Sequence, residues 1–112
     1  MRRSICLMGC LLFIFSVAAT AQTTSGQISG TVVDPQAAVV PGAKVVLVNE
    51  GTGSTRTATT GSNGTFVFPA LTPGGYNLRV ETSGFKSLQR TGILLTANEE
   101  RSLGSLALQV GG

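Results

Sequence analysis

The chain has 112 residues, with eight lysines and arginines against five aspartates and glutamates, two cysteines, and no histidine or tryptophan. This length suffices for one small domain. The lack of histidine excludes a Ser-His-Asp triad, a Cys-His pair and a histidine-ligated metal centre. We therefore expect a protein that is not an enzyme, with no catalytic, cofactor-binding or metal-binding residues.

Residues 1–21 have the pattern of a secretory signal peptide. Two arginines precede an apolar run over residues 5–19, and small residues lead to a cleavage site between Ala21 and Gln22. The apolar run is shorter than the roughly 20 residues that span a bilayer as a helix. Cleavage is therefore favoured over a retained anchor, and over a lipid-attachment box ending at Cys10, whose apolar lead-in is short. We expect export to the periplasm, the outer membrane or the extracellular space.

The remaining chain has six basic and five acidic side chains and no cysteine. This balance leaves no basic patch for nucleic acid. Without disulfides, stability must come from core burial. We assign residues 22–26 to a short linker, residues 27–110 to one domain, and residues 111–112 to the C-terminal end.

Short runs of Val, Ile, Thr, Phe and Leu, separated by Gly, Pro, Asn and Ser, predict an all-β domain. Pro41-Gly42 is typical of a type II turn, and Asn63-Gly64 predicts a type I′ hairpin between two strands. The number and spacing of the runs favour a β-sandwich of about seven strands. The expected strands cover residues 28–34, 43–49, 54–60, 65–68 and 76–81, with weaker ones around 85–90, 93–96 and 103–110.

Alternation along the strands predicts which side chains form the core. Tyr76, Leu78 and Val80 share one face of their strand, with polar residues between them. Val46 and Val48 have the outward parity, and we expect the loop with Val39 and Val40 to cover them; an exposed apolar patch is the alternative. The predicted core is Ile28, Val32, Val45, Leu47, Phe66, Phe68, Leu71, Tyr76, Leu78, Val80, Phe85, Leu106 and Leu108.

Five segments in order resemble the carboxypeptidase-regulatory-like domain. They are Ile28–Asp34, Val40–Val45, Thr59–Phe68, Leu71–Val80 and Gly84–Lys86. The resemblance covers residues 26–110 and implies a transthyretin-like, or prealbumin-like, Greek-key β-sandwich. In two places the chain departs from the family pattern, since Ala37-Ala38 stands where glycine is frequent and Asn63 where aspartate is common.

Such a domain directly after a signal peptide looks like the N-terminal extension of Oar-like TonB-dependent outer-membrane receptors. The ending Leu106–Gly112 resembles the junction at which these receptors continue into a plug and barrel. We therefore expect a fragment or a truncated reading frame. The resemblance implies that its partner is a protein or the rest of a receptor chain, and that its association with the outer membrane is indirect.

Two polar groups could form chemical sites, but a surface role is favoured for both. Glu99-Glu100 with Asp34 would supply oxygens for calcium, yet strand neighbours point to opposite faces, so a solvated turn is preferred. A lysine–asparagine crosslink, which the resemblance to adhesin modules suggests, needs a buried lysine, and Lys44 has the parity opposite to Leu47. The residues of that crosslink would be Lys44, Glu50 and Asn98.

We predict a non-catalytic exported module that binds a protein partner by strand addition, with Ser54–Thr60 as the candidate edge strand. The alternative is a carbohydrate-binding module of starch-binding-like fold, in which exposed aromatic rings stack on sugars. Four aromatic side chains remain after the signal peptide, and three of the four have inward parity. The four are Phe66, Phe68, Tyr76 and Phe85.

Overall fold

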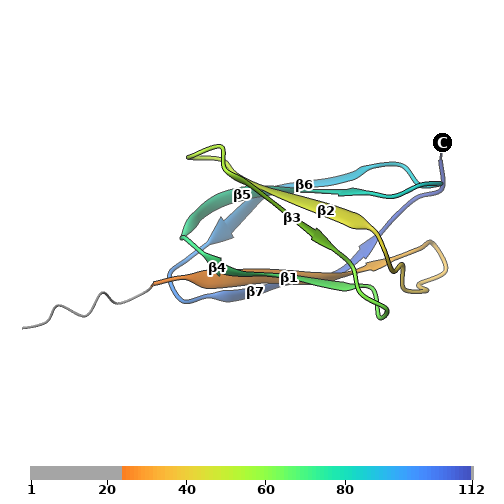
Figure 1. Ribbon diagram of the computed structural model, residues 1–112, viewed down its shortest axis with the longest axis horizontal. Coiled ribbons are helices and arrows are strands. Elements are labelled where there is room, and N and C mark those ends of the chain that lie inside the picture. Colours follow the sequence, from red (N-terminus) through yellow and green to blue (C-terminus); the bar gives the residue numbers. More distant parts are fainter. Residues whose placement is uncertain (1–23, 112) are drawn as a thin grey trace, which may run out of the picture.

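The computed structural model describes residues 24–111, which fold into two facing β-sheets (Figure 1). The strands are β1 (Gly26–Val33), β2 (Lys44–Asn49), β3 (Thr55–Thr59), β4 (Thr65–Leu71), β5 (Gly74–Glu81), β6 (Leu88–Leu95) and β7 (Glu100–Ala107). The predicted all-β sandwich of about seven strands is confirmed. The predicted signal peptide over residues 1–21 and its cleavage site between Ala21 and Gln22 lie outside the described residues. Within residues 24–111, no helix has the length and hydropathy needed to cross a membrane.

The strand order is β4-β1-β7 in one sheet and β3-β2-β5-β6 in the other. Only the β2–β3 and β5–β6 connections stay within a sheet, and all the remaining connections cross from one sheet to the other. β1 and β7 run parallel, whereas the other paired strands are antiparallel. Strands β3 and β4 therefore lie at the edges of different sheets. They are on the same side of the sandwich, where Arg56 of β3 donates a hydrogen bond to β4.

The core lies between the sheets, where the alternation of β5 places Tyr76, Leu78 and Val80 on the inner face, and Leu78 and Val80 pair with apolar residues of β2. Leu78 pairs with Leu47, for example, and both are about 1% exposed. Burying a side chain of this size contributes about 1.5–3 kcal/mol. Of the predicted core residues, twelve are buried, but Phe85 is only partly buried and packs against the core from its margin. The core also contains Ala43, Ile93 and Leu95.

The predicted hairpin at Asn63-Gly64 is wrong, because the strands on either side belong to different sheets. Gly64 has a φ of 76°, but Asn63 lacks the positive φ that a type I′ turn requires. The side-chain oxygen of Asn63 instead accepts hydrogen bonds from the backbone N–H and hydroxyl of Thr65, at 3.3 and 2.8 Å. The turn therefore carries the chain across the sandwich.

Two weak strands were predicted around residues 85–90 and 93–96, but the structure has one strand there, β6. Residues 85–87 precede this strand. Gly92, inside β6, has a φ of 70°, and the pairing with β5 shifts register between Tyr76 and Leu78. A positive φ at a register shift is typical of a β-bulge. The glycine therefore bends the strand without ending it.

The expected loop cover over Val46 and Val48 is wrong. Val39 bridges to Val33, and the Val40 N–H donates to the Val32 carbonyl oxygen at 2.9 Å, so this loop packs against the end of β1. Val46 is nevertheless buried on the outer face of its sheet. It lines a shallow hollow of about 190 Å³ with residues of β2, β5 and β6: Val48, Asn77, Leu78, Arg79, Gln89 and Thr91.

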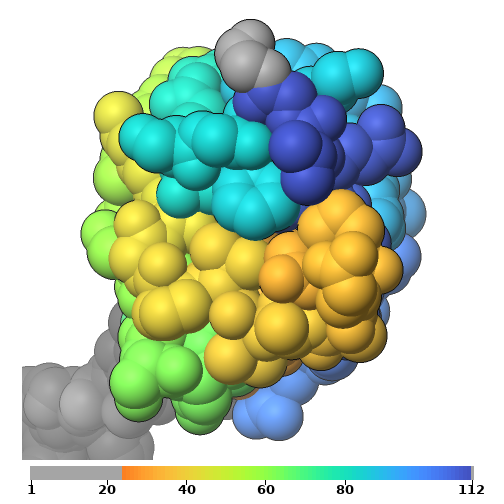
Figure 2. Space-filling model, turned by 90° about the vertical axis from the view of Figure 1, so that its right-hand side faces the viewer, coloured from red at the N-terminus to blue at the C-terminus, as the bar shows by residue number. Residues whose placement is uncertain are grey.

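The loop after β1 forms the turn in which the family often has glycine, although alanine stands there. Ala37 has a φ of 68°, in the left-handed region that favours glycine. Asp34 supports this turn, since its carboxylate accepts hydrogen bonds from the N–H groups of Gln36 and Ala38, each at 2.9 Å. Figure 2 shows this loop, in orange, beside the blue C-terminal residues at one end of the molecule.

Candidate functional site

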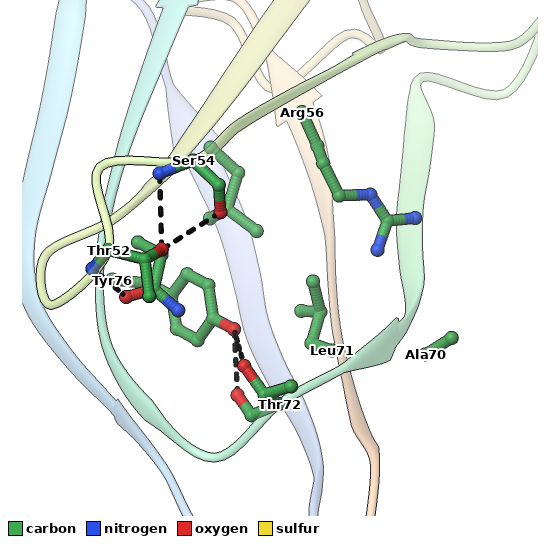
Figure 3. A pocket seen from close by; sticks show the side chains of 9 residues that line it. Thr52, Ser54, Arg56, Ala70, Leu71, Thr72 and Tyr76 are labelled. Carbon is green, nitrogen blue, oxygen red and sulfur yellow. Dashed lines mark hydrogen bonds between the residues drawn. The ribbon is translucent and has the colours of Figure 1, made fainter.

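The side of the sandwich between β3 and β4 contains a hollow of about 420 Å³ (Figure 3). Because β3 and β4 belong to different sheets, no strand pairing closes this side. Leu47, Leu71 and Tyr76 are buried core residues and form its apolar floor. The other lining residues are Asn49, Thr52, Ser54, Arg56, Ala70 and Thr72.

Arg56 connects the two sheets beside this hollow. It pairs with the buried Leu47, so its side chain starts on the inner face of β3. Its Nη1 donates to the Pro69 carbonyl oxygen of β4 at 2.7 Å, and its guanidinium carbon lies 6.0 Å from the centre of the Phe68 ring. A cation at this distance from an aromatic ring gains about 0.5–1 kcal/mol at an exposed site. Arg56 therefore presents a positive charge next to an apolar floor.

Hydrogen bonds hold the polar rim in place on both sides of the hollow. The side-chain oxygen of Asn49 accepts from two N–H groups of the β2–β3 turn, at 2.8 and 3.1 Å. In that turn the Thr52 hydroxyl donates to the Ser54 hydroxyl at 3.1 Å. Across the hollow, the Tyr76 hydroxyl donates to the Thr72 carbonyl oxygen at 2.7 Å (Figure 3). Both rims are thus fixed before any ligand arrives.

The backbone of β3 offers a free hydrogen-bonding edge on the same side. At the two ends of the β2–β3 pair, the Asn49 N–H donates to Ser54 O and the Thr60 N–H donates to Ala43 O, each at 2.9 Å. Paired residues in an antiparallel ladder alternate between bonded and non-bonded positions, so the intervening residues of β3 direct their N–H and C=O groups away from β2. These are Thr55, Thr57 and Thr59.

β3 is the most regular of the four edge strands in the described part of the chain. It pairs with β2 over five consecutive positions without a register shift. Positive φ values interrupt the other three edges, at Ala70 in β4 (58°), Gly92 in β6 (70°) and Gly104 in β7 (70°). Bulges and kinks hinder the addition of a further strand. The predicted edge segment Ser54–Thr60 is thus confirmed as an edge, and it is the one best suited to a partner strand.

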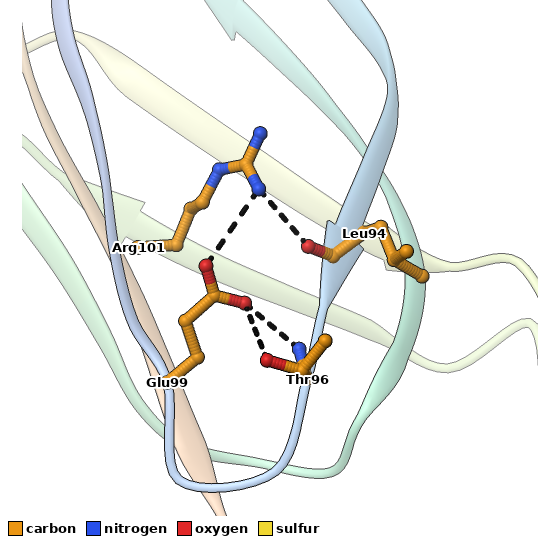
Figure 4. A network of polar contacts seen from close by, with 4 residues as sticks. All are labelled: Leu94, Thr96, Glu99 and Arg101. Carbon is orange, nitrogen blue, oxygen red and sulfur yellow. Dashed lines mark hydrogen bonds and ion pairs between the residues drawn. The ribbon is translucent and has the colours of Figure 1, made fainter.

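A second arginine closes the opposite side of the sandwich, between β6 and β7 (Figure 4). Nη1 of Arg101 donates to the Leu94 carbonyl oxygen at 3.2 Å and lies 3.7 Å from the Glu99 carboxylate. The backbone N–H and the hydroxyl of Thr96 donate to Glu99 Oε1, at 2.8 and 3.0 Å. These two hydrogen bonds, and to a smaller extent Arg101, hold the pKa of Glu99 below its ordinary value of 4.5.

We expect the Glu99→Gln variant to be less sensitive to acid than the parent chain. A carboxyl group with a lowered pKa in the folded state stabilises the protein above its unfolded pKa, and this contribution is lost as the pH falls through the folded value. The free energy of unfolding, measured by urea titration between pH 7 and pH 3, should therefore decrease more in the parent than in the variant. Glu100→Gln, at the exposed start of β7, is the matched control and should follow the parent. Parallel pH profiles for the parent and Glu99→Gln would contradict this role.

The structure does not bring together the polar groups that the sequence suggested. Asp34 follows the end of β1, whereas the Glu99 carbonyl oxygen accepts a hydrogen bond from Gln27 at its start. Lys44 is exposed at the start of β2, and Glu50 lies just beyond its other end. Among the residues described, no three His, Cys, Asp or Glu side chains gather closely enough to hold a metal ion.

The aromatic side chains within residues 24–111 do not form a platform for sugars. Phe66, Phe68 and Tyr76 are each about 2–3% exposed, and Phe85 is partly buried against the core. Stacking on a sugar ring needs an exposed aromatic face. The described aromatic residues therefore give no support to the carbohydrate-binding alternative.

Sequence reasoning found the β3 edge but missed the hollow beside it. Its lining residues come from β2, β3, the end of β4, the start of β5 and the β2–β3 and β4–β5 turns. Only the sheet order places them together. One signal was available, because Arg56 is a lone charge in a threonine-rich strand, at a position with inward parity.

Solved structures with the same fold come from proteins with different roles. The backbone protein of the group B streptococcus pilus 2b has 22% identity and a TM-score of 0.57, with 78% of this chain and 42% of that chain covered. A cohesin–X-dockerin complex from Acetivibrio cellulolyticus has 18% identity and a TM-score of 0.58 (77% and 58% covered). Catechol 1,2-dioxygenase from Pseudomonas arvilla has 13% identity and a TM-score of 0.62 (84% and 55% covered). At these identities the likeness shows the fold alone.

The comparisons of sequence are more specific. A search of curated proteins finds no significant match. The family model of the carboxypeptidase regulatory-like domain matches residues 27–109, which include nearly all of the sandwich. The chain therefore belongs to the carboxypeptidase regulatory-like domain family.

Proposed function

We propose that this domain is a non-catalytic interaction module that binds an extended segment of a partner protein along β3. The carrying observation is that β3 is an edge strand with free backbone groups at Thr55, Thr57 and Thr59 and no interruption of its pairing. A partner strand would satisfy these groups and extend the four-stranded sheet. The same fold occurs in a pilus backbone protein and in a cohesin–X-dockerin complex, so it is compatible with a role in protein interactions.

We further propose that the module is exported and forms the N-terminal extension, or a fragment, of a TonB-dependent outer-membrane receptor. Two features support this setting, namely the signal-like residues 1–21 and the family resemblance of the domain that follows them. Sequencing the N-terminus of the exported protein tests the first step. An N-terminus other than Gln22 would contradict the expected cleavage.

The Thr57→Pro variant tests strand addition. Thr57 directs its N–H away from β2, so proline removes a donor from the free edge without breaking the β2–β3 pairing. Ten-residue peptides selected by the parent protein from a display library are the probe. We expect the variant to bind them about tenfold or more weakly, since it loses a hydrogen bond and its ring obstructs the incoming strand.

Two observations complete this test. Thr57→Val changes the side chain but keeps the N–H, so it should bind the peptides as the parent does. In the parent, bound peptide should slow hydrogen exchange at Thr55, Thr57 and Thr59. Equal binding by Thr57→Pro and the parent would overturn strand addition at β3.

A further inference from the structure

The hollow beside β3 is placed to receive a side chain from the partner strand. Along β3, Arg56 and Ala58 pair with the buried Leu47 and Val45 and share their inward direction. A strand added to β3 would continue this alternation, so every second side chain would also point inward. Ser54 and Arg56 line the hollow, so inward side chains opposite them would meet it.

The polar part of the hollow offers hydrogen-bond donors. Nη1 of Arg56 is bonded to Pro69, but a guanidinium group has five N–H donors in a planar fork. None of the nine lining residues is acidic. A guanidinium group with free donors in a hollow without acidic side chains matches a carboxylate, which accepts only and pairs well with arginine.

The apolar part is adjacent to those donors. Leu47, Leu71 and Tyr76 form the floor, and the Tyr76 hydroxyl is already satisfied by Thr72. Inward positions of a strand recur every second residue, about 6.6–6.8 Å apart. A partner strand with a carboxylate opposite Arg56 and an apolar side chain opposite Ser54 would therefore complement both parts of the hollow.

We propose that the hollow selects a partner strand that carries Asp or Glu at the inward position opposite Arg56 and an apolar residue two positions away, opposite Ser54. This inference rests on the proposed strand addition at β3 and specifies the chemistry of the partner. Arg56 supplies selectivity through charge, because an amide or a lysine at that inward position would forfeit the ion pair.

The test repeats the peptide selection with Arg56→Gln, with Arg56→Lys, and with Arg90→Gln as a matched control. Arg90 is exposed on β6, at the other edge of the same sheet. The parent should enrich peptides with an acidic residue two positions from an apolar one. A selected peptide should lose about tenfold in affinity when its acidic residue is replaced by the corresponding amide. That preference should vanish in Arg56→Gln and persist in Arg56→Lys and Arg90→Gln. Urea titration of each variant checks that it folds.

The outcomes separate this inference from the proposal on which it rests. Selected peptides that bind β3 and are sensitive to Thr57→Pro, but show no acidic preference, would overturn the inference alone. Peptides insensitive to Thr57→Pro would overturn both. Self-association of the free protein that Thr57→Pro abolishes, with no peptide enriched, would make a second copy the occupant and would also overturn the inference.

Discussion

Replacing Phe68 with alanine should destabilise the domain by about 3–5 kcal/mol, the usual loss for truncating a buried phenylalanine. Phe68 is the largest fully buried side chain and lies in β4 opposite Ile28. Its ring centre lies 5.8 Å from that of Phe66. The guanidinium carbon of Arg56 lies 6.0 Å from the Phe68 ring centre, at the open side of the sandwich. Alanine would leave a cavity between the sheets and remove the aromatic support of Arg56. Small domains have a total stability of only about 5–15 kcal/mol, so a large part of it would be lost.

Urea unfolding followed by circular dichroism measures this effect, with Val67→Ala as the matched control. Val67 is the preceding residue of the same strand, but it is 48% exposed. Its truncation should cost less than about 1 kcal/mol, since it changes strand propensity and leaves the core intact. A loss below 1 kcal/mol for Phe68→Ala would show that the two sheets do not share the close-packed core described above.

The sequence was informative where one face of a strand is buried and the other is solvated. In β5 the alternation of Tyr76, Leu78 and Val80 with polar residues predicted both the strand and its inward face. In β3 the threonine-rich composition predicted a solvated strand and a candidate edge. Burial pattern is a local property, so it can be read from neighbouring residues alone.

Connections between strands were harder to predict, because a turn sequence does not state which strands it joins. Asn63-Gly64 is a strong hairpin signal, yet here Gly64 closes a turn that crosses between sheets. The weak strands predicted around residues 85–90 and 93–96 gave the opposite error, since the structure has one strand there, β6, with a bulge at Gly92. In both cases the local sequence did not show how the segment fits into the topology.

The candidate site could be predicted only in part for the same reason. The free edge of β3 follows from one segment, whereas the hollow requires β3 and the end of β4 to face each other across the sandwich. Arg56 and Pro69 are thirteen residues apart, and nothing in their local sequence indicates the hydrogen bond between them. The partner chemistry that we propose therefore depends on the tertiary arrangement. The edge strand, by contrast, could be predicted from the composition of β3 alone.

Replacing Gly64 with alanine should destabilise the domain by about 2–5 kcal/mol, through two separate effects. The first is backbone strain, because Gly64 has a φ of 76° and a side chain in this region costs about 1–2 kcal/mol. The second is steric, since an added Cβ would lie 2.9 Å from both the Val32 carbonyl oxygen and the Val39 Cβ. Val32 cannot easily move away, because its N–H donates to the Gly64 carbonyl oxygen at 2.8 Å. Overpacking of this kind typically costs about 1–3 kcal/mol.

Gly42→Ala separates these two effects, because Gly42 has the same φ of 76° and no atom within 4 Å of an added Cβ. Both substitutions restrict the unfolded chain equally, so the difference between their free energies of unfolding isolates the steric effect. We expect Gly42→Ala to lose about 1–2 kcal/mol and Gly64→Ala to lose about 1–3 kcal/mol more. Equal losses in urea titration would mean that the crossover turn is not packed against β1. In that case the packing of this turn would not fix the place at which the chain crosses from β3 to β4.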